Sequence, residues 1–216
     1  MQKTNFFYLL VALLFLLLSI PITDDLRGIS TPVAKAVVFS VMLLIGIWSL
    51  RGSGRFFSIG LAFVVAGFVL NIVAINSHIT FFQYSAILAV MGFLLVTITF
   101  TLRQVVVGTE INANRLVGAI CVYLMLGVIW ALAYSLVELA VPGSFGGVTA
   151  GQDAGWDSEW LYFSFVTLTT LGYGDILPLS ALARALAYME AVTGQFYVAI
   201  LVAGLVSAYI SDRQSA

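Results

Sequence analysis

Charged residues are scarce in this chain, and their scarcity limits the class of protein it can be. Of its 216 residues, 9% are charged and 62% are hydrophobic, whereas a soluble domain carries about 25% charged residues. The mean hydropathy is +1.09. The net charge of −1 at pH 7 offers no basic surface to a nucleic acid. The composition therefore indicates an integral membrane protein and argues against nucleic acid as a partner.

Cysteine and histidine are nearly absent as well. Cys121 is the one cysteine, so a single chain can form neither a disulfide nor a cysteine-based zinc site. His78 is the one histidine and stands in a short polar loop between two apolar segments. Catalysis by a histidine dyad or by a bound metal would need partner residues that the sequence lacks. We therefore expect no enzyme activity and no cofactor.

Long apolar segments are abundant, and six of them have the length of a membrane span. A spanning helix needs about 20 apolar residues at 1.5 Å each. The segments cover approximately residues 5–22, 33–50, 56–75, 79–102, 116–140 and 181–210. The first follows Lys3, as a signal peptide would, but no small-residue cleavage site comes after it. We therefore predict an all-α membrane protein with six transmembrane helices.

Basic residues in the connecting loops predict the orientation. With the N-terminus inside, six of them are cytoplasmic, namely Lys3, Arg51, Arg55, Arg103, Arg115 and Arg213. Three lie outside, namely Arg27, Lys35 and Arg184. Since cytoplasmic loops carry the excess of lysine and arginine, we expect both termini to be cytoplasmic in a multi-pass protein of the cell membrane.

One polar run, from Thr167 to Asp175, interrupts the apolar pattern between the last two segments and reads TLTTLGYGD. Backbone carbonyls can replace the water shell of a cation if the strand is extended and kinked at residues with φ > 0, which glycine adopts cheaply. Gly172 and Gly174 alternate as such a strand requires. The preceding helix, from Ser158 to about Thr169, reaches only about 18 Å. It must therefore re-enter the membrane from the same side.

Residues Thr170 to Gly174, reading TLGYG, resemble the TVGYG filter of potassium channels. With the helices on either side, the resemblance to the potassium-channel pore family covers roughly residues 115–210. It implies that the carbonyls of Thr170, Leu171, Gly172 and Tyr173, with the Thr170 hydroxyl, bind K⁺. Leu171 departs from the usual valine, which places the K⁺/Na⁺ selectivity in question. One chain supplies one filter strand, so the resemblance implies a homotetramer.

Residues around the filter have expected supporting roles. The resemblance implies an aromatic cuff behind the filter that includes Tyr162, with plain core packing as an equal alternative. Thr169 and Asp175 flank the filter. Acidic residues gather at the expected outer mouth and either concentrate cations or form a solvated rim; they are Asp153, Asp157, Glu159 and Asp175. Many family members carry a buried acid where Val166 stands.

The last apolar segment contains two unusual residues, Glu190 and Gly194. Gly194 is either a hinge, as the resemblance implies, or a site of close helix packing. An ionisable residue inside a span costs about 2.5–3.5 kcal/mol, so Glu190 needs a partner. It is either hydrogen-bonded to the short helix behind the filter, which we favour, or exposed to a cavity. In the first arrangement Gln195 and Val198 line the cavity.

These features predict three regions. Residues 1–102 form a four-helix N-terminal transmembrane domain, residues 103–114 a cytoplasmic linker, and residues 115–216 the pore domain. The fourth segment, 79–102, carries no charge, so it lacks the arginines of a voltage sensor and we expect no strong intrinsic voltage dependence. Because the chain ends a few residues after the last segment, we expect no cytoplasmic ligand-binding domain.

The predicted function is passive, K⁺-selective conduction through a homotetramer in a lipid membrane, with K⁺ as the permeant ion and no cofactor. Three alternatives stay open. Leu171 and the missing buried acid favour a weakly selective cation channel. A non-conducting membrane subunit or scaffold would have the same spans. An intramembrane enzyme is the weakest alternative, because Glu190 and the filter threonines do not form a catalytic set.

Overall fold

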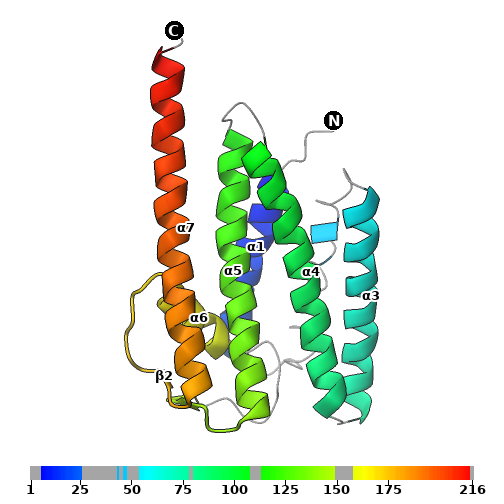
Figure 1. Ribbon diagram of the computed structural model, residues 1–216. Coiled ribbons are helices and arrows are strands. Elements are labelled where there is room, and N and C mark those ends of the chain that lie inside the picture. Colours follow the sequence, from blue (N-terminus) through cyan, green and yellow to red (C-terminus); the bar gives the residue numbers. More distant parts are fainter. Residues whose placement is uncertain are drawn as a thin grey trace.

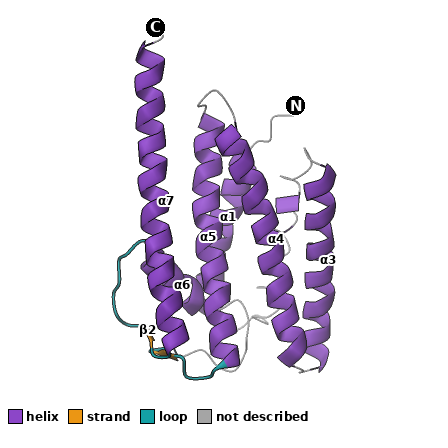
Figure 2. Ribbon diagram, viewed as in Figure 1, coloured by secondary structure: helices purple, strands orange, loops and turns teal. Residues whose placement is uncertain are grey.

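The computed structural model describes residues 6–25, 43, 46–47, 54–77, 80–107, 113–148 and 158–214. These residues are mostly helical (Figures 1 and 2). The helices are α1 (Phe6–Asp25), α3 (Gly54–Ser77), α4 (Thr80–Val107), α5 (Ala113–Ala140), α6 (Ser158–Leu168) and α7 (Ala181–Gln214). Strand β1 (Phe145–Gly146) pairs antiparallel with β2 (Leu177–Pro178).

Three helices in the described part of the chain are long and apolar enough to cross a membrane, over Gly54–Val73, Thr80–Val105 and Asn114–Ala140. They coincide with the third, fourth and fifth predicted segments. The first appears as a shorter apolar helix, Phe6–Ile22. Most of the second, 33–50, lies outside the described residues. The helical content agrees with an all-α membrane protein, and the count of six spans stays a prediction.

The connection between α4 and α5 is shorter than the sequence predicts. The predicted linker starts at residue 103, whereas α4 continues to Val107 and α5 begins at Ala113. Two contacts stabilise the extra turn. The guanidinium of Arg103 lies 5.3 Å from the centre of the Phe56 ring, and Arg115 donates a hydrogen bond from Nε to the Val105 carbonyl at 2.9 Å. Polar residues therefore do not end the helix where they first occur.

Helix α1 packs along α5 through one face. Its large buried residues recur at spacings of three and four, the pattern of a packed helix stripe, and are Phe6, Leu9, Leu13, Leu16 and Ile20. The backbone N–H of Phe6 donates to Asn114 Oδ1 at 2.9 Å, which places the start of α1 beside the start of α5. The first segment is therefore packed directly against the outer helix of the predicted pore domain.

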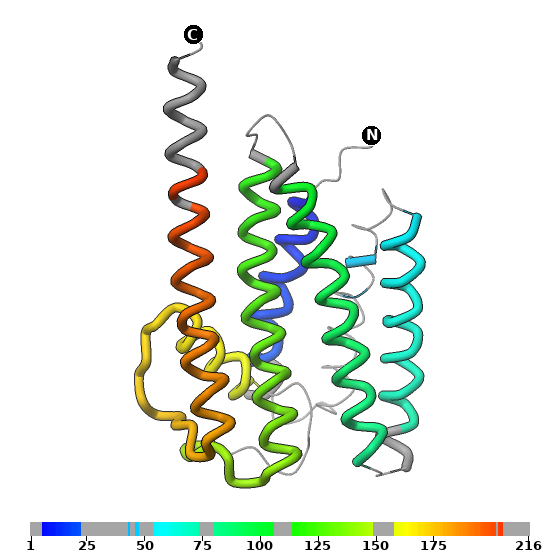
Figure 3. Tube along the Cα trace, viewed as in Figure 1, coloured from blue at the N-terminus to red at the C-terminus, as the bar shows by residue number. Residues whose placement is uncertain are grey.

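The long helices run in two opposite directions. Helices α1, α3 and α5 begin, and α4 and α7 end, toward one end of the molecule (Figures 1 and 3). The short α6 lies at the opposite half, between α5 and α7, together with the β1–β2 pair (Figure 1). Three arginines, Arg55, Arg103 and Arg115, lie in terminal turns at the first end, and Arg184 lies near the start of α7 at the other.

An aromatic cluster holds α6 against α5. Tyr134 of α5 meets Phe163 of α6 edge-on, with ring centres 4.8 Å apart. Phe145 of β1 packs edge-on against Trp160 at 5.1 Å and against Phe163 at 5.5 Å. Such pairs each contribute about 0.5–1.5 kcal/mol beyond area burial. The cluster therefore holds the first half of α6 against α5 and β1.

Candidate functional site

The short helix α6 is positioned by close contacts to α5. The Ser164 hydroxyl lies 2.7 Å from the Gly127 carbonyl of α5. A side chain at Gly127 would meet the Phe165 ring at 2.6 Å, so glycine at this position admits that ring. Glu159 lies in the first turn of α6, where a negative charge complements the helix dipole. The C-terminal end of α6 is thereby directed at the TLGYG loop.

The loop after α6 leaves the helix with an unusual backbone. The N–H groups of Leu171 and Gly172 both donate to the Val166 carbonyl, at 2.9 and 3.2 Å. Positive φ values alternate with ordinary ones along the loop, at 58° for Thr170, 60° for Gly172 and 79° for Gly174. The two glycines have the backbone that the sequence predicts. The left-handed Thr170 was not predicted, because a β-branched residue rarely adopts it.

The side chains of this loop are exposed on the single chain. Leu171 is 56% exposed and Tyr173 is 68% exposed. The Leu171 side chain, which is one methylene longer than the usual valine, is therefore not buried against its own chain. Thr169 directs its hydroxyl back to the Phe165 carbonyl at 2.6 Å. An exposed apolar patch of this kind is typical of a surface that contacts another protein or a further copy of the chain.

The outer end of the loop is braced by α6. The Tyr162 hydroxyl donates to Asp175 Oδ2 at 2.5 Å, and the Tyr162 and Tyr173 rings stack with centres 6.4 Å apart. The hydrogen bond from Tyr162 holds the pKa of Asp175 below its ordinary value. The structure thus brings together three of the residues that the sequence singles out here, whereas Asp153 and Asp157 lie outside the described residues.

The segment around β1 packs on the outer side of the loop, a contact that was not predicted from the sequence. Leu179 donates from its N–H to the Ser144 carbonyl at 2.7 Å. Gly147 has a φ of 81°, and a side chain there would come within 1.9 Å of the Asp175 carbonyl. Gly147 therefore permits a close backbone approach to Asp175. A single sequence could not reveal this role, since the region contains several other glycines.

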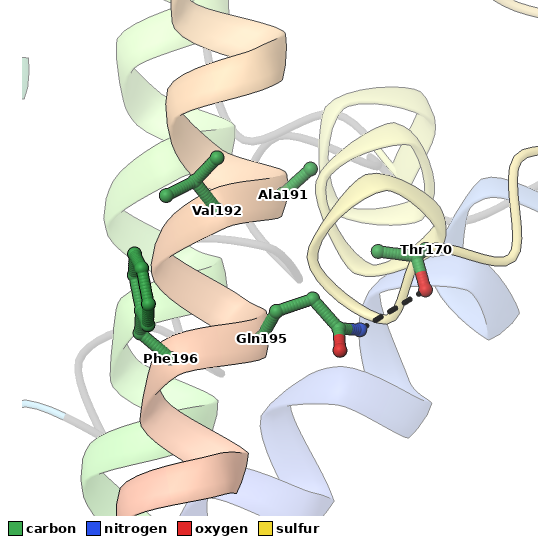
Figure 4. A pocket seen from close by; sticks show the side chains of 5 residues that line it. All are labelled: Thr170, Ala191, Val192, Gln195 and Phe196. Carbon is green, nitrogen blue, oxygen red and sulfur yellow. Dashed lines mark hydrogen bonds between the residues drawn. The ribbon is translucent and has the colours of Figure 1, made fainter.

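At its inner end the loop is joined to α7 by Gln195. The Gln195 side-chain amide donates from Nε2 to Thr170 Oγ1 at 3.1 Å. Figure 4 shows the two side chains pointing toward each other beside a hollow of about 260 Å³. The hollow is lined by Thr170, Ala191, Val192, Gln195 and Phe196. Gln195 therefore lines this hollow, and its place in a central cavity stays a prediction. Val198, one turn further along α7, is 44% exposed and is not among these lining residues.

Glu190 is fully buried between α5, α6 and α7. Its Oε1 lies 2.6 Å from Ser164 Oγ, and its Oε2 accepts a hydrogen bond from the Tyr134 hydroxyl. Of the two arrangements open from the sequence, this is the one behind the short helix. Neither Tyr134 nor Ser164 was singled out in the sequence, because a partner 56 or 26 residues away leaves no local pattern.

Gly194 lies at the point where α7 touches the end of α6. A side chain there would come within 2.2 Å of the Leu168 carbonyl. Helix α7 is continuous from Ala181 to Gln214. Close packing therefore accounts for this glycine, and a hinge role stays a prediction.

Comparison with known proteins finds similarity to potassium channels over part of the chain. Residues 118–211 match a family described as "Ion channel". The chain is 33% identical over 82 residues to the inward rectifier potassium channel Kirbac3.1 of Paramagnetospirillum magnetotacticum, a match that covers 36% of this chain and 24% of that one. It is 41% identical over 56 residues to two-pore potassium channel 3 of Arabidopsis thaliana, covering 26% of this chain and 13% of the relative.

A third relative, two pore potassium channel c of Oryza sativa subsp. japonica, is 39% identical over 75 residues, covering 35% of this chain and 16% of the relative. The chain therefore spans a quarter or less of the length of these curated relatives. No solved structure matches the chain significantly.

Proposed function

We propose, from the premise that residues 118–211 form a pore segment of the potassium-channel pore family, that this chain is the subunit of a passive K⁺ channel. The observation that carries the proposal is the loop Thr170 to Gly174, in which positive φ alternates with ordinary φ directly after the C-terminal end of a short buried helix. Ion transport of this kind requires neither catalysis nor a cofactor, and K⁺ is the permeant ion.

The filter would act by replacing the hydration shell of K⁺. The ligands are the backbone carbonyls of residues 170 to 173 and the Thr170 hydroxyl, with Gly174 supplying the final kink. The C-terminal end of α6, which is the negative end of its dipole, favours a cation below the filter. Gln195 holds the Thr170 side chain at that same end.

The working unit would be a homotetramer, because one strand cannot surround an ion and four related strands can. The exposure of Leu171 and Tyr173 on the single chain supports this arrangement, since neighbouring subunits would cover both. Membrane lipid and three identical subunits are the proposed partners.

We also propose six spans with both termini cytoplasmic in the cell membrane. The position of Arg55, Arg103 and Arg115 at the end of the molecule where α7 ends supports this orientation, with the Tyr173 end of the filter outside. Helix α4 contains one charged residue, Arg103, near its end. Such a helix carries too little charge to drive strong voltage dependence.

A weakly selective cation channel is the second candidate, favoured by Leu171, which replaces the usual valine. Flux from liposomes that contain only the purified protein separates the possibilities, with K⁺ and Na⁺ gradients compared. We expect K⁺ flux without Na⁺ flux, lost in Gly172→Ala, because alanine is strained at a φ of 60°. Equal flux of both ions would favour the weakly selective channel. The absence of flux from intact tetramers would favour a non-conducting subunit.

A further inference from the structure

Glu190 lies in a chain of three oxygen–oxygen contacts, and the hydroxyl groups in that chain supply only two hydrogens. The Tyr134 hydroxyl contacts Glu190 Oε2. Ser164 Oγ contacts both Glu190 Oε1, at 2.6 Å, and the Gly127 carbonyl, at 2.7 Å. Each of these three contacts is within hydrogen-bond distance, and each needs one proton between its two oxygens.

The two hydroxyl groups supply only two of the three protons. A backbone carbonyl can only accept, so Ser164 donates to Gly127 and has no hydrogen left for Glu190. With an ionised carboxylate, Glu190 Oε1 and Ser164 Oγ would then face each other with lone pairs at 2.6 Å. If Ser164 turned its hydrogen to Glu190, the same repulsion would arise at the Gly127 carbonyl. One contact is therefore unfavourable unless the carboxyl group carries the third proton.

The surroundings of Glu190 also favour a neutral group. Glu190 is fully buried, with 0% of its surface exposed, and an unpaired charge in such a place is costly. Among the residues that the structure describes, the titratable side chains that face it are two tyrosines of α5, Tyr134 by hydrogen bond and Tyr123 at a longer distance. Ser164 is its polar contact from α6, and β2 (Leu177–Pro178) has no titratable side chain. The groups named here supply no positive charge.

We infer that Glu190 is a protonated, neutral glutamic acid in the conducting protein, and that it acts as a positioning residue which ties α7 and α5 to the helix behind the filter. This inference rests on the proposed function for its effect on ion flux. The protonation state of Glu190 does not depend on that function. Loss of the proton would break one contact of the chain at Ser164, four residues before Leu168, the last residue of α6.

Substitutions at Glu190 separate a neutral acid from a charged one. Glu190→Gln keeps a donor and an acceptor at the same positions, so we expect flux within about threefold of the wild type, whereas Glu190→Leu loses about tenfold or more. We expect wild-type flux to fall as the pH is raised far enough to remove the proton, and Glu190→Gln flux to stay constant. Loss of flux in Glu190→Gln, equal to that in Glu190→Leu, would overturn the inference.

A matched pair of serines tests the hydrogen-bond chain. Ser164→Ala removes the central hydroxyl, and we expect flux to fall about tenfold. Ser135→Ala makes the same chemical change at a buried serine of α5, whose hydroxyl has no hydrogen-bond partner among the residues that the structure describes. We expect its flux and thermal stability to stay as in the wild type. Equal effects of the two substitutions would contradict the inference.

Infrared spectroscopy of the reconstituted protein tests the proton without relying on conduction. The difference between wild type and Glu190→Gln at neutral pH should contain the C=O stretching band of a protonated carboxylic acid. A carboxylate band in its place would overturn the inference even if the protein conducts K⁺. Conversely, a protein that carries the acid band and conducts no ion would refute the proposed function while leaving the protonation of Glu190 intact.

Discussion

Replacing Gly194 by alanine adds one methyl group at the contact between α7 and the end of α6. The new Cβ would lie 2.2 Å from the Leu168 carbonyl oxygen and 3.0 Å from Leu168 Cδ1. Ordinary van der Waals contact begins at 3.4 Å, so the two helices must separate by about 1.2 Å. The obstacle is mainly backbone, which cannot move aside as a flexible side chain can.

The size of the effect follows from two opposing terms. Alanine in place of glycine in a helix interior stabilises by about 1 kcal/mol. Overpacking a close contact costs about 1–3 kcal/mol, and a backbone clash lies at the upper part of that range. Gly204→Ala, on the same helix, gains the first term without the second, because no heavy atom of the described residues lies within 4 Å of its new Cβ.

Thermal unfolding of the purified protein and K⁺ flux from liposomes measure the difference between the two variants. We expect Gly194→Ala to be about 2–3 kcal/mol less stable than Gly204→Ala, and to lose flux because α6 is displaced with the filter that follows it. We expect Gly204→Ala to match or exceed the wild type in stability.

Equal stability of the two variants would refute the close-packing account of Gly194. A Gly194→Ala protein with wild-type stability but altered opening would favour the hinge instead, because a hinge substitution changes conformational preference and leaves the contact with Leu168 intact.

Three further predictions concern the filter and its outer mouth. Gly147→Ala should destabilise the protein by more than Gly143→Ala, since both have φ above 80° but only Gly147 faces a close atom, the Asp175 carbonyl at 1.9 Å; equal thermal midpoints would contradict this. Tyr162→Phe should lower thermal stability at neutral pH and have a smaller effect in acid. Because the pKa of Asp175 is lowered in the folded protein, its hydrogen bond to Tyr162 stabilises the fold at pH values above the ordinary pKa of 3.8. This stability is lost as the pH falls through the pKa of Asp175 in the folded protein. An effect of Tyr162→Phe that does not depend on pH would therefore argue against the hydrogen bond. Leu171→Val should leave the K⁺/Na⁺ permeability ratio within about twofold, because the carbonyl and not the side chain faces the ion; a large rise in the ratio would show that Leu171 weakens the filter.

The kinked backbone of the loop from Thr170 to Gly174 could be predicted from the sequence because it depends on local residues. Gly172 and Gly174 are two residues apart, and positive φ is a property of each residue and its neighbours. The need of Glu190 for a hydrogen-bond partner could also be predicted, because a carboxyl group within an apolar segment is costly without one. The short α6 was predicted between the last two apolar segments, and its end at Leu168 lies one residue from the predicted end at about Thr169.

The contacts that position the filter could not be predicted. Tyr134 and Ser164, the partners of Glu190, and the approach of Gly147 to Asp175 join residues far apart in the sequence. Nothing near these residues distinguishes them from their neighbours. The end of α4 at Val107 was also missed, because Arg115 accounts for it through a contact ten residues away.

The reversal potential of the purified protein in a planar bilayer tests the central claim most directly, with K⁺ on one side and Na⁺ on the other. A tetrameric filter of carbonyls from residues 170 to 173 predicts a potential far from zero. The compartment that contains K⁺ should be negative, because K⁺ leaves it. A reversal potential near zero, from the same currents, would show that this pore does not select K⁺ and would contradict the account.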